Sequence, residues 1–185
     1  MNKTPRRVTA ASLENAALHY LERFATSSEN LRRVLLRRVR RSAEAHGDDP
    51  AEGAALVEAL IARWRSAGLL DDAAYAETKV QALHRRGASP RAIRMKLASR
   101  GVEAEVVEGA VEALGCEADF EAAVNLARRR RLGPFRAEAA RADSRQRDLA
   151  TMGRAGFGWE VARRVIDAEN PDALVGHASE AGPPP

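Results

Sequence analysis

The sequence predicts an all-α protein, an elongated tandem array of three three-helix repeats. Alanine, leucine and arginine, which favour helices, are abundant, whereas isoleucine, threonine and tyrosine are scarce. Hydrophobic residues make up 45% of the 185 residues and aromatic residues only 4%, so aliphatic side chains must form most of the core. The stretch LASRGVEAEVVEGAV (97–111) has the same pattern as MGRAGFGWEVARRVI (152–166). A pattern that recurs after about fifty residues is typical of helical repeats. The units of such repeats stack because each alone buries little apolar surface.

The first repeat is predicted over 12–67, after a polar, basic N-terminal arm (1–11) that we expect to be flexible. A first helix begins at Ser12, with apolar residues three and four apart. The sequence Thr26-Ser27-Ser28-Glu29 matches a capping box, with Thr26 as the N-cap of a second helix. Glycine, aspartate and proline make 42–54 turn-rich, so this segment is predicted to interrupt the helices before a third one over 55–67.

The second repeat is predicted over 71–115. Asp71 or Asp72 begins its first helix, which Gly87 ends. Ser89-Pro90 is a strong start signal for the next helix, with serine as N-cap and proline at the first helical position. Gly101 is suited to the left-handed position that closes this helix, and Val102 to the apolar contact that accompanies such a cap.

The third repeat is predicted over 118–168. Its first helix begins at Asp119, a later helix lies near 143–154, and Gly156-Phe157 forms the turn that corresponds to Gly101-Val102. The intervening segment 136–148 is polar and arginine-rich, with few large apolar residues. The tail, 169–185, is predicted to be disordered.

The residue patterns indicate no catalytic, cofactor-binding or metal-binding site, and no cofactor is expected. The Asp71-Asp72 pair is better explained as a capped helix start, and GRAGFG (153–158) lacks the lysine of a phosphate-binding loop and a preceding strand. Cys116 is the only cysteine and lies in no motif. The histidines are scattered without ligand spacing; they are His19, His46, His84 and His177.

The basic clusters are the stronger functional feature. The formal net charge is +4, and the positive charge is almost entirely arginine. Arginine-rich surfaces suit phosphates or acidic protein surfaces, although a solvated face paired with neighbouring glutamates explains any one cluster equally well. One cluster falls in each predicted repeat. The candidate partner-binding residues are Arg32, Arg33, Arg37, Arg38, Arg40, Arg41, Arg85, Arg86, Arg91, Arg94, Lys96, Arg100, Arg128, Arg129, Arg130 and Arg131.

The chain is predicted to be a soluble cytoplasmic protein that does not contact a membrane. Its N-terminal residues lack the continuous apolar stretch of a signal peptide. No apolar run approaches the length of a transmembrane helix. A single cysteine permits no internal disulfide, which fits a reducing compartment.

These residues resemble the RecX family, the regulators of the RecA recombinase. The first unit of the family looks like ALHYLERFATSSENLRRVL (17–35), and its middle unit looks like residues 68–111. The middle unit has the residues of the family pattern in the same order along the chain. They are Asp71-Asp72, Tyr75-Ala76, the RRG turn at 85–87 and Arg100-Gly101-Val102. The resemblance to the third unit of the family is weaker and lies in AVNLARRRR (123–131) and MGRAGFGWEVARRVI (152–166).

The resemblance implies a non-enzymatic monomer that lodges in the groove of a RecA–single-stranded-DNA filament. It would modulate, mostly inhibit, RecA's ATPase, recombinase and coprotease activities in DNA repair. It would touch single-stranded DNA directly or through RecA, to which the ATP would belong.

Two alternatives stay open. Residues 89–111 can be interpreted as a helix-turn-helix of a DNA-binding regulator that acts without RecA. Four glutamates in the second helix would be repelled by phosphates, which argues against groove reading by that helix; they are Glu103, Glu105, Glu108 and Glu112. The other alternative is a helical adaptor whose arginines only increase solubility.

Overall fold

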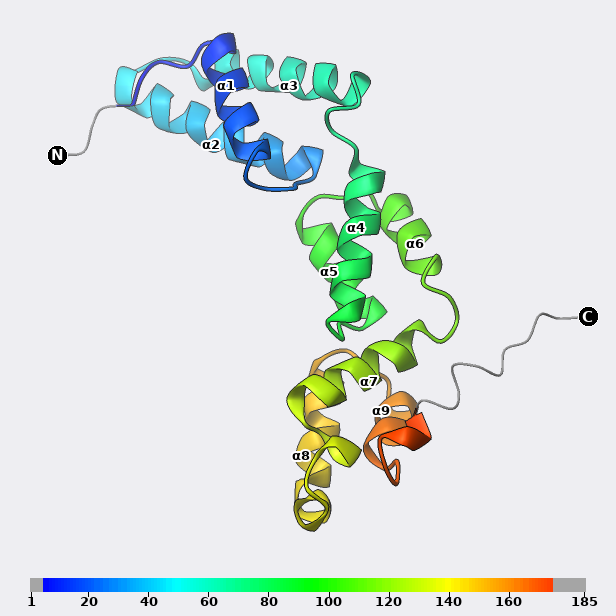
Figure 1. Ribbon diagram of the computed structural model, residues 1–185. Helices are drawn as coiled ribbons and strands as arrows, with labels where there is room; N and C mark the ends of the chain where they lie inside the picture. The colour runs from blue at the N-terminus through cyan, green and yellow to red at the C-terminus, as the bar shows by residue number, and fades with distance from the viewer. Residues whose placement is uncertain (1–4, 175–185) are drawn as a thin grey trace, which may run out of the picture. The chain divides into compact units, whose positions relative to one another are not determined.

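The computed structural model describes residues 5–174 and places most of them in helices (Figure 1). No β-strand occurs in this range, so the all-α class predicted from the composition is confirmed. The predicted tail beyond residue 174, with His177, lies outside the described residues. The α-helices are α1 (Ala10–Leu21), α2 (Ser28–His46), α3 (Pro50–Ser66), α4 (Asp72–Arg85), α5 (Pro90–Ser99), α6 (Ala104–Glu112), α7 (Ala118–Arg130), α8 (Arg141–Arg154) and α9 (Trp159–Ile166).

The chain divides into two compact units. The N-terminal unit comprises the residues up to 76 together with 98–106, and the C-terminal unit comprises 77–97 together with the residues from 107 onward. Helices α4, α5 and α6 therefore each contribute to both units. The division into repeats at 12–67, 71–115 and 118–168 stays a prediction.

The core of the N-terminal unit forms where α1, α2 and α3 pack against one another. The predicted three-and-four spacing brings one apolar face of each helix inward. The resulting cluster is at most 7% exposed, and its members from these helices are Leu13, Ala17, Leu31, Leu35, Val39, Val57, Leu60, Ile61 and Trp64.

The predicted interruption within 42–54 is present but much shorter than expected: it spans only 47–49, and helix occupies the rest of the segment. Helix α2 continues to His46, and α3 begins at Pro50 after Asp49, whose carboxylate accepts a hydrogen bond from the Ala51 amide at 2.8 Å. Gly53, taken as a helix breaker, lies buried inside α3. A Cβ there would lie 2.6 Å from Val39 Cγ1, so glycine is what allows α2 and α3 to approach.

The predicted capping box at the start of α2 is also corrected. Ser27, not Thr26, is the N-cap, and its Oγ accepts from the Asn30 amide at 3.2 Å. Thr26 instead accepts a hydrogen bond from the Asn30 side chain at 2.7 Å. Glu29 does not reach back to the cap because arginines further along the helix bind its carboxylate.

Part of the predicted flexible arm contacts the folded core. Residues 10 and 11 already belong to α1, whose N-cap is Thr9. The Val8 amide donates to Ser42 Oγ at 3.2 Å, and that hydroxyl donates to the Arg6 carbonyl at 3.2 Å. The buried Ser42 side chain of α2 therefore holds this part of the arm.

The core of the C-terminal unit gathers α7, α8 and α9. Helix α7 supplies a nearly continuous buried face, and Leu149 and Met152 come from α8 and Val165 and Ile166 from α9. Leu174, within the predicted tail, is 5% exposed and packs in the same cluster.

The polar segment 136–148 joins this unit by hydrogen bonds instead of apolar packing. Asp148 is 3% exposed and accepts from the Gly133 amide at 2.9 Å and from Arg136 Nη2 at 2.8 Å. Arg141 donates to the carbonyls of Pro134 and Glu169 at 2.9 and 2.7 Å. Arginines and a buried carboxylate thus replace the large apolar residues that this stretch lacks.

The predicted caps of the second and third repeats are confirmed. Gly101 has φ +73° and is followed by buried Val102, and Gly156 has φ +92° and is followed by buried Phe157. Asp71 is the residue that caps α4, since its carboxylate accepts from the Ala74 amide at 2.9 Å. The neighbouring Asp72 instead accepts from the Ser28 amide, at the start of α2, at 2.7 Å.

Candidate partner-binding surface

The arginines of α2 divide into a paired set and an unpaired set. Arg37, Arg38, Arg40 and Arg41 are exposed, and none forms an ion pair with another described residue. We call these four the α2 arginine cluster. Their guanidinium groups keep all donors for a partner, and because no glutamate neutralises them, they form a fixed positive charge on this helix.

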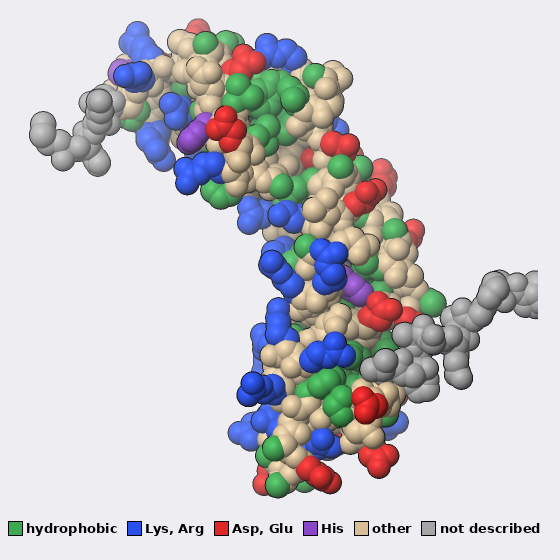
Figure 2. All heavy atoms as spheres, viewed as in Figure 1, with side chains coloured by type: hydrophobic (Ala, Val, Ile, Leu, Met, Phe, Trp, Pro, Cys, Tyr) green, Lys and Arg blue, Asp and Glu red, His purple; other side chains and the backbone are tan. Residues whose placement is uncertain are grey.

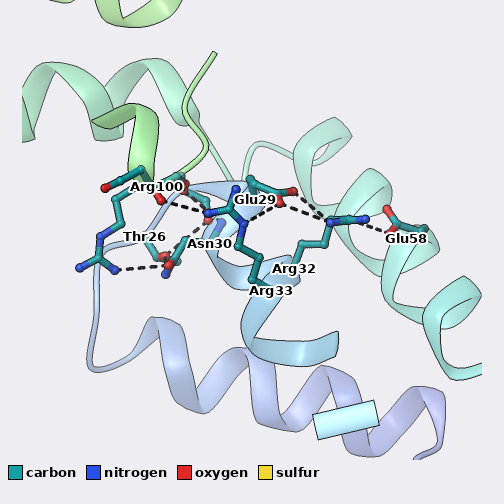
Figure 3. A network of polar contacts seen from close by, with 9 residues as sticks. Thr26, Glu29, Asn30, Arg32, Arg33, Glu58 and Arg100 are labelled. Atoms are coloured by element: carbon teal, nitrogen blue, oxygen red, sulfur yellow. Dashed lines mark hydrogen bonds and ion pairs between the residues drawn. The ribbon is translucent and has the colours of Figure 1, made fainter. Parts of the chain in front are cut away.

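Arg32 and Arg33 already bind glutamates of their own unit (Figure 3). Glu29 accepts from Arg33 Nε at 2.8 Å, and Glu58 of α3 accepts from Arg32 Nε at 2.7 Å. The hydrogen bond to Glu58 raises the pKa of Arg32 above its ordinary value, and the charge of Glu29 adds to this effect. These two arginines therefore hold parts of the fold together, whatever else they bind.

Arg33 and Arg100 also connect α2 to the end of α5. Arg33 Nη1 donates to the Ser99 carbonyl at 3.0 Å, and Arg100 Nη1 donates to Asn30 Oδ1 at 3.3 Å (Figure 3). Ser27 Oγ donates to the Arg100 carbonyl at 2.5 Å. The N-terminal end of α2 is thus fixed to the turn at Gly101 by side chains from both sides.

The predicted middle cluster is similarly mixed. Arg85, Arg86 and Arg91 are exposed and form no ion pair within the described part of the chain. Arg94 Nε lies 2.8 and 2.9 Å from the two carboxylate oxygens of Glu108 in α6. This hydrogen bond raises the pKa of Arg94 and lowers that of Glu108. Lys96 is exposed on α5.

The third cluster lies at the C-terminal end of α7. Arg128 stacks over the Phe135 ring with its guanidinium carbon 5.6 Å from the ring centroid. Arg129, Arg130 and Arg131 are exposed and form no ion pair with the residues described. In Figure 2, Lys and Arg side chains crowd the α7–α8 side of the C-terminal unit. Cations also suit this helix end because the helix dipole is negative there.

The turn between α4 and α5 packs against α7. Gly87 has φ +77°, and a Cβ there would lie 2.7 Å from the Leu126 Cα in α7. His84 Nε2 lies 2.7 Å from the Ala118 carbonyl oxygen, which fixes α4 against the start of α7. The turn that carries Arg85 and Arg86 therefore lies about one helical turn from the Arg129 region.

Replacing Gly87 by alanine is expected to lower the free energy of unfolding by about 3 kcal/mol. The left-handed backbone costs about 1 kcal/mol with a side chain, and the overlap with α7 adds the cost of overpacking. Gly115→Ala is the matched control, because Gly115 has φ +90° but no atom within 4 Å of its Cβ position. We expect the control to lose only about 1 kcal/mol in urea denaturation. Equal losses would show that the close approach to Leu126 is unimportant.

The described residues contain no group of three or more histidine, cysteine, aspartate or glutamate side chains that could hold a metal ion. Two of the histidines lie within hydrogen-bond distance of backbone carbonyl oxygens. His84 Nε2 contacts the Ala118 oxygen and His46 Nε2 the Pro5 oxygen, each at 2.7 Å. Cys116 is exposed and free. Separately, none of the helices described combines the length and the apolar character needed to span a bilayer.

Sequence reasoning overlooked Arg154 as a basic surface residue. It is exposed at the end of α8, within the GRAGFG stretch that was interpreted only as a helix stop. No local sequence signal marked Arg154, because its exposure at the end of α8 depends on how that helix packs.

Comparison with known proteins gives consistent similarities. The model of the second three-helix domain of RecX matches residues 71–111. A protein of Myxococcus xanthus named regulatory protein RecX is 48% identical over 168 residues, 90% of each chain. A protein of the same name from Agrobacterium fabrum is 32% identical and covers 82% of this chain and 80% of its own length.

A crystal structure of regulatory protein RecX shares the fold. Its TM-score is 0.61 at 23% sequence identity, and the match covers 86% of this chain and 72% of the other. The helical fold and the curated relatives thus agree with the resemblance seen in the sequence. This chain belongs to the RecX family of regulatory proteins.

Proposed function

We propose that this protein binds the RecA–single-stranded-DNA filament and modulates, mostly by inhibition, the ATPase, recombinase and coprotease activities of RecA. RecX family membership supports a regulatory role, and the observation that favours contact with the filament is the set of exposed arginines without ion pairs. Both units contribute to this set, through the α2 arginine cluster and through Arg85, Arg86 and Arg129–Arg131. Arginines that are not paired with glutamates are suited to bind a polyanionic filament, because their charge is available to neutralise phosphates.

On this proposal the protein acts as a monomer in the cytoplasm, in DNA repair, recombination and the SOS response. It has no catalytic activity of its own, since the ATP belongs to RecA. The three predicted three-helix repeats are the units that follow the filament, and the family match at 71–111 supports the middle one.

The test is RecA ATPase on single-stranded DNA with this protein titrated in, together with co-sedimentation on the filament. We expect a saturable loss of ATP hydrolysis at or below one molecule per RecA. A folded preparation that neither binds the filament nor changes the rate contradicts the proposal. Tight binding to a duplex site in the absence of RecA would instead favour the helix-turn-helix alternative.

A further inference from the structure

An open groove of about 530 Å³ lies between α5 and the C-terminal end of α8 with the turn that follows it. Both walls belong to the C-terminal unit. Its volume is within the range of sites that bind small ligands or single side chains of a partner. The residues that line it are Arg91, Ala92, Met95, Lys96, Gly153, Arg154, Ala155 and Gly156.

The two walls of the groove are fixed to each other. Ser89, the N-cap of α5, is fully buried, and its Oγ donates to the Ala155 carbonyl at 2.8 Å. A Cβ on Gly156 would lie 2.7 Å from the same Oγ, so glycine permits this close approach. The groove is therefore part of the folded unit and needs no rearrangement to accept a ligand.

The lining is basic at its sides and apolar between them. It contains two arginines and a lysine and no acidic residue. Arg154 uses one Nη2 contact, at 3.3 Å, to Thr151 Oγ1. Met95 is 67% exposed, which leaves an unbranched apolar side chain in solvent beside the alanines and glycines of the wall.

We propose that this groove binds a short acidic peptide segment of a partner protein. Carboxylates of the segment pair with Arg91 and Arg154, and an apolar side chain covers Met95. Methionine suits such a surface because its flexible thioether adapts to different apolar partners. No aromatic side chain lines the groove, so it lacks the stacking platform that single-stranded nucleic acid uses.

The direct test measures binding of a short fluorescein-labelled peptide of aspartate, glutamate and leucine to the full chain by fluorescence anisotropy. The blocking variant is Gly153→Leu. Because nothing lies within 4 Å of the Gly153 Cβ position, leucine there fills the groove without displacing the fold. The matched control is Gly109→Leu in α6, another helical glycine with nothing within 4 Å. Both changes replace glycine by a better helix former, so both variants should stay folded.

We expect Gly153→Leu to weaken peptide binding by about tenfold or more, and Gly109→Leu to bind like the original chain. The double variant Arg91→Glu, Arg154→Glu should lose binding to the same degree and gain affinity for the matching lysine–leucine peptide. The proposal is overturned if the original chain does not bind the acidic peptide saturably, or if Gly153→Leu binds it as well as Gly109→Leu does. Loss of oligo(dT) binding on Gly153→Leu, with peptide binding kept, assigns the groove to nucleic acid and also overturns it. RecA is absent from this experiment, so its failure is separate from failure of the proposed function.

Discussion

Asp148→Ala is expected to lower the free energy of unfolding of the C-terminal unit by about 3 kcal/mol. The Asp148 side chain is 4% exposed and pairs with Arg136 at 2.8 Å. Removing one partner of a buried pair costs about 3–5 kcal/mol, because the other charge loses its compensation. The Arg136 side chain is 30% exposed, so water recovers part of this loss and the lower end of the range applies.

The backbone adds to this loss. The Gly133 amide donates to Asp148 Oδ2 at 2.9 Å, and the alanine variant leaves this buried donor without its acceptor. Asp148→Asn keeps an acceptor oxygen and should therefore lose less than Asp148→Ala. A smaller loss of stability in Asp148→Asn than in Asp148→Ala would show that the hydrogen bond to the Gly133 amide stabilises the unit separately from the charge.

The matched control for Asp148 is Asp167→Ala in the same unit. Asp167 binds Arg145 through two hydrogen bonds of 2.7 Å, but both side chains are more than a third exposed. Exposed pairs contribute at most about 1 kcal/mol, so the control should lose no more than that. Urea denaturation followed by circular dichroism, with hydrogen exchange of the α8 amides, measures both variants. A loss below 1 kcal/mol for Asp148→Ala would show that this network does not stabilise the unit.

Replacing all four residues of the α2 arginine cluster by glutamine is expected to weaken binding to the RecA filament by about a hundredfold near physiological salt. Each cation that contacts a phosphate of single-stranded nucleic acid contributes about 0.7 to the slope of log affinity against log salt. If all four make such contacts, the slope should fall by about three. Glutamine is a good helix former, so α2 should stay intact.

The matched control for this variant is Arg32→Gln with Arg33→Gln on the same helix. Both arginines are bound to glutamates, so their replacement should change filament affinity little and lower the stability by about 1 kcal/mol. Filament co-sedimentation over a range of salt concentrations measures affinity, and thermal unfolding measures stability. If the fourfold variant binds like the original chain, the partner surface lies on other arginines, and the α2 cluster only increases solubility.

Much of the fold could be predicted from local sequence signals. Ser89-Pro90, Asp71, Gly101 and Gly156 each act through their own backbone or through residues a few positions away, so their roles as caps and helix ends were predictable. The predictions failed where a distant residue decided the outcome. Gly53 and the 42–54 segment were interpreted as a turn, but the approach of α2 to α3 makes that glycine a packing position.

The sequence by itself determined the all-α class, most helix ends and which segments carry arginine, because these depend on composition, spacing and neighbouring residues. Tertiary structure alone decided which arginines are neutralised by glutamates of other helices. Arg32 meets Glu58 and Arg94 meets Glu108 only after helices far apart in sequence pack together. Packing likewise buried the Asp148 carboxylate in a polar stretch with few large apolar residues, because the Arg136 side chain and the Gly133 amide both donate to it.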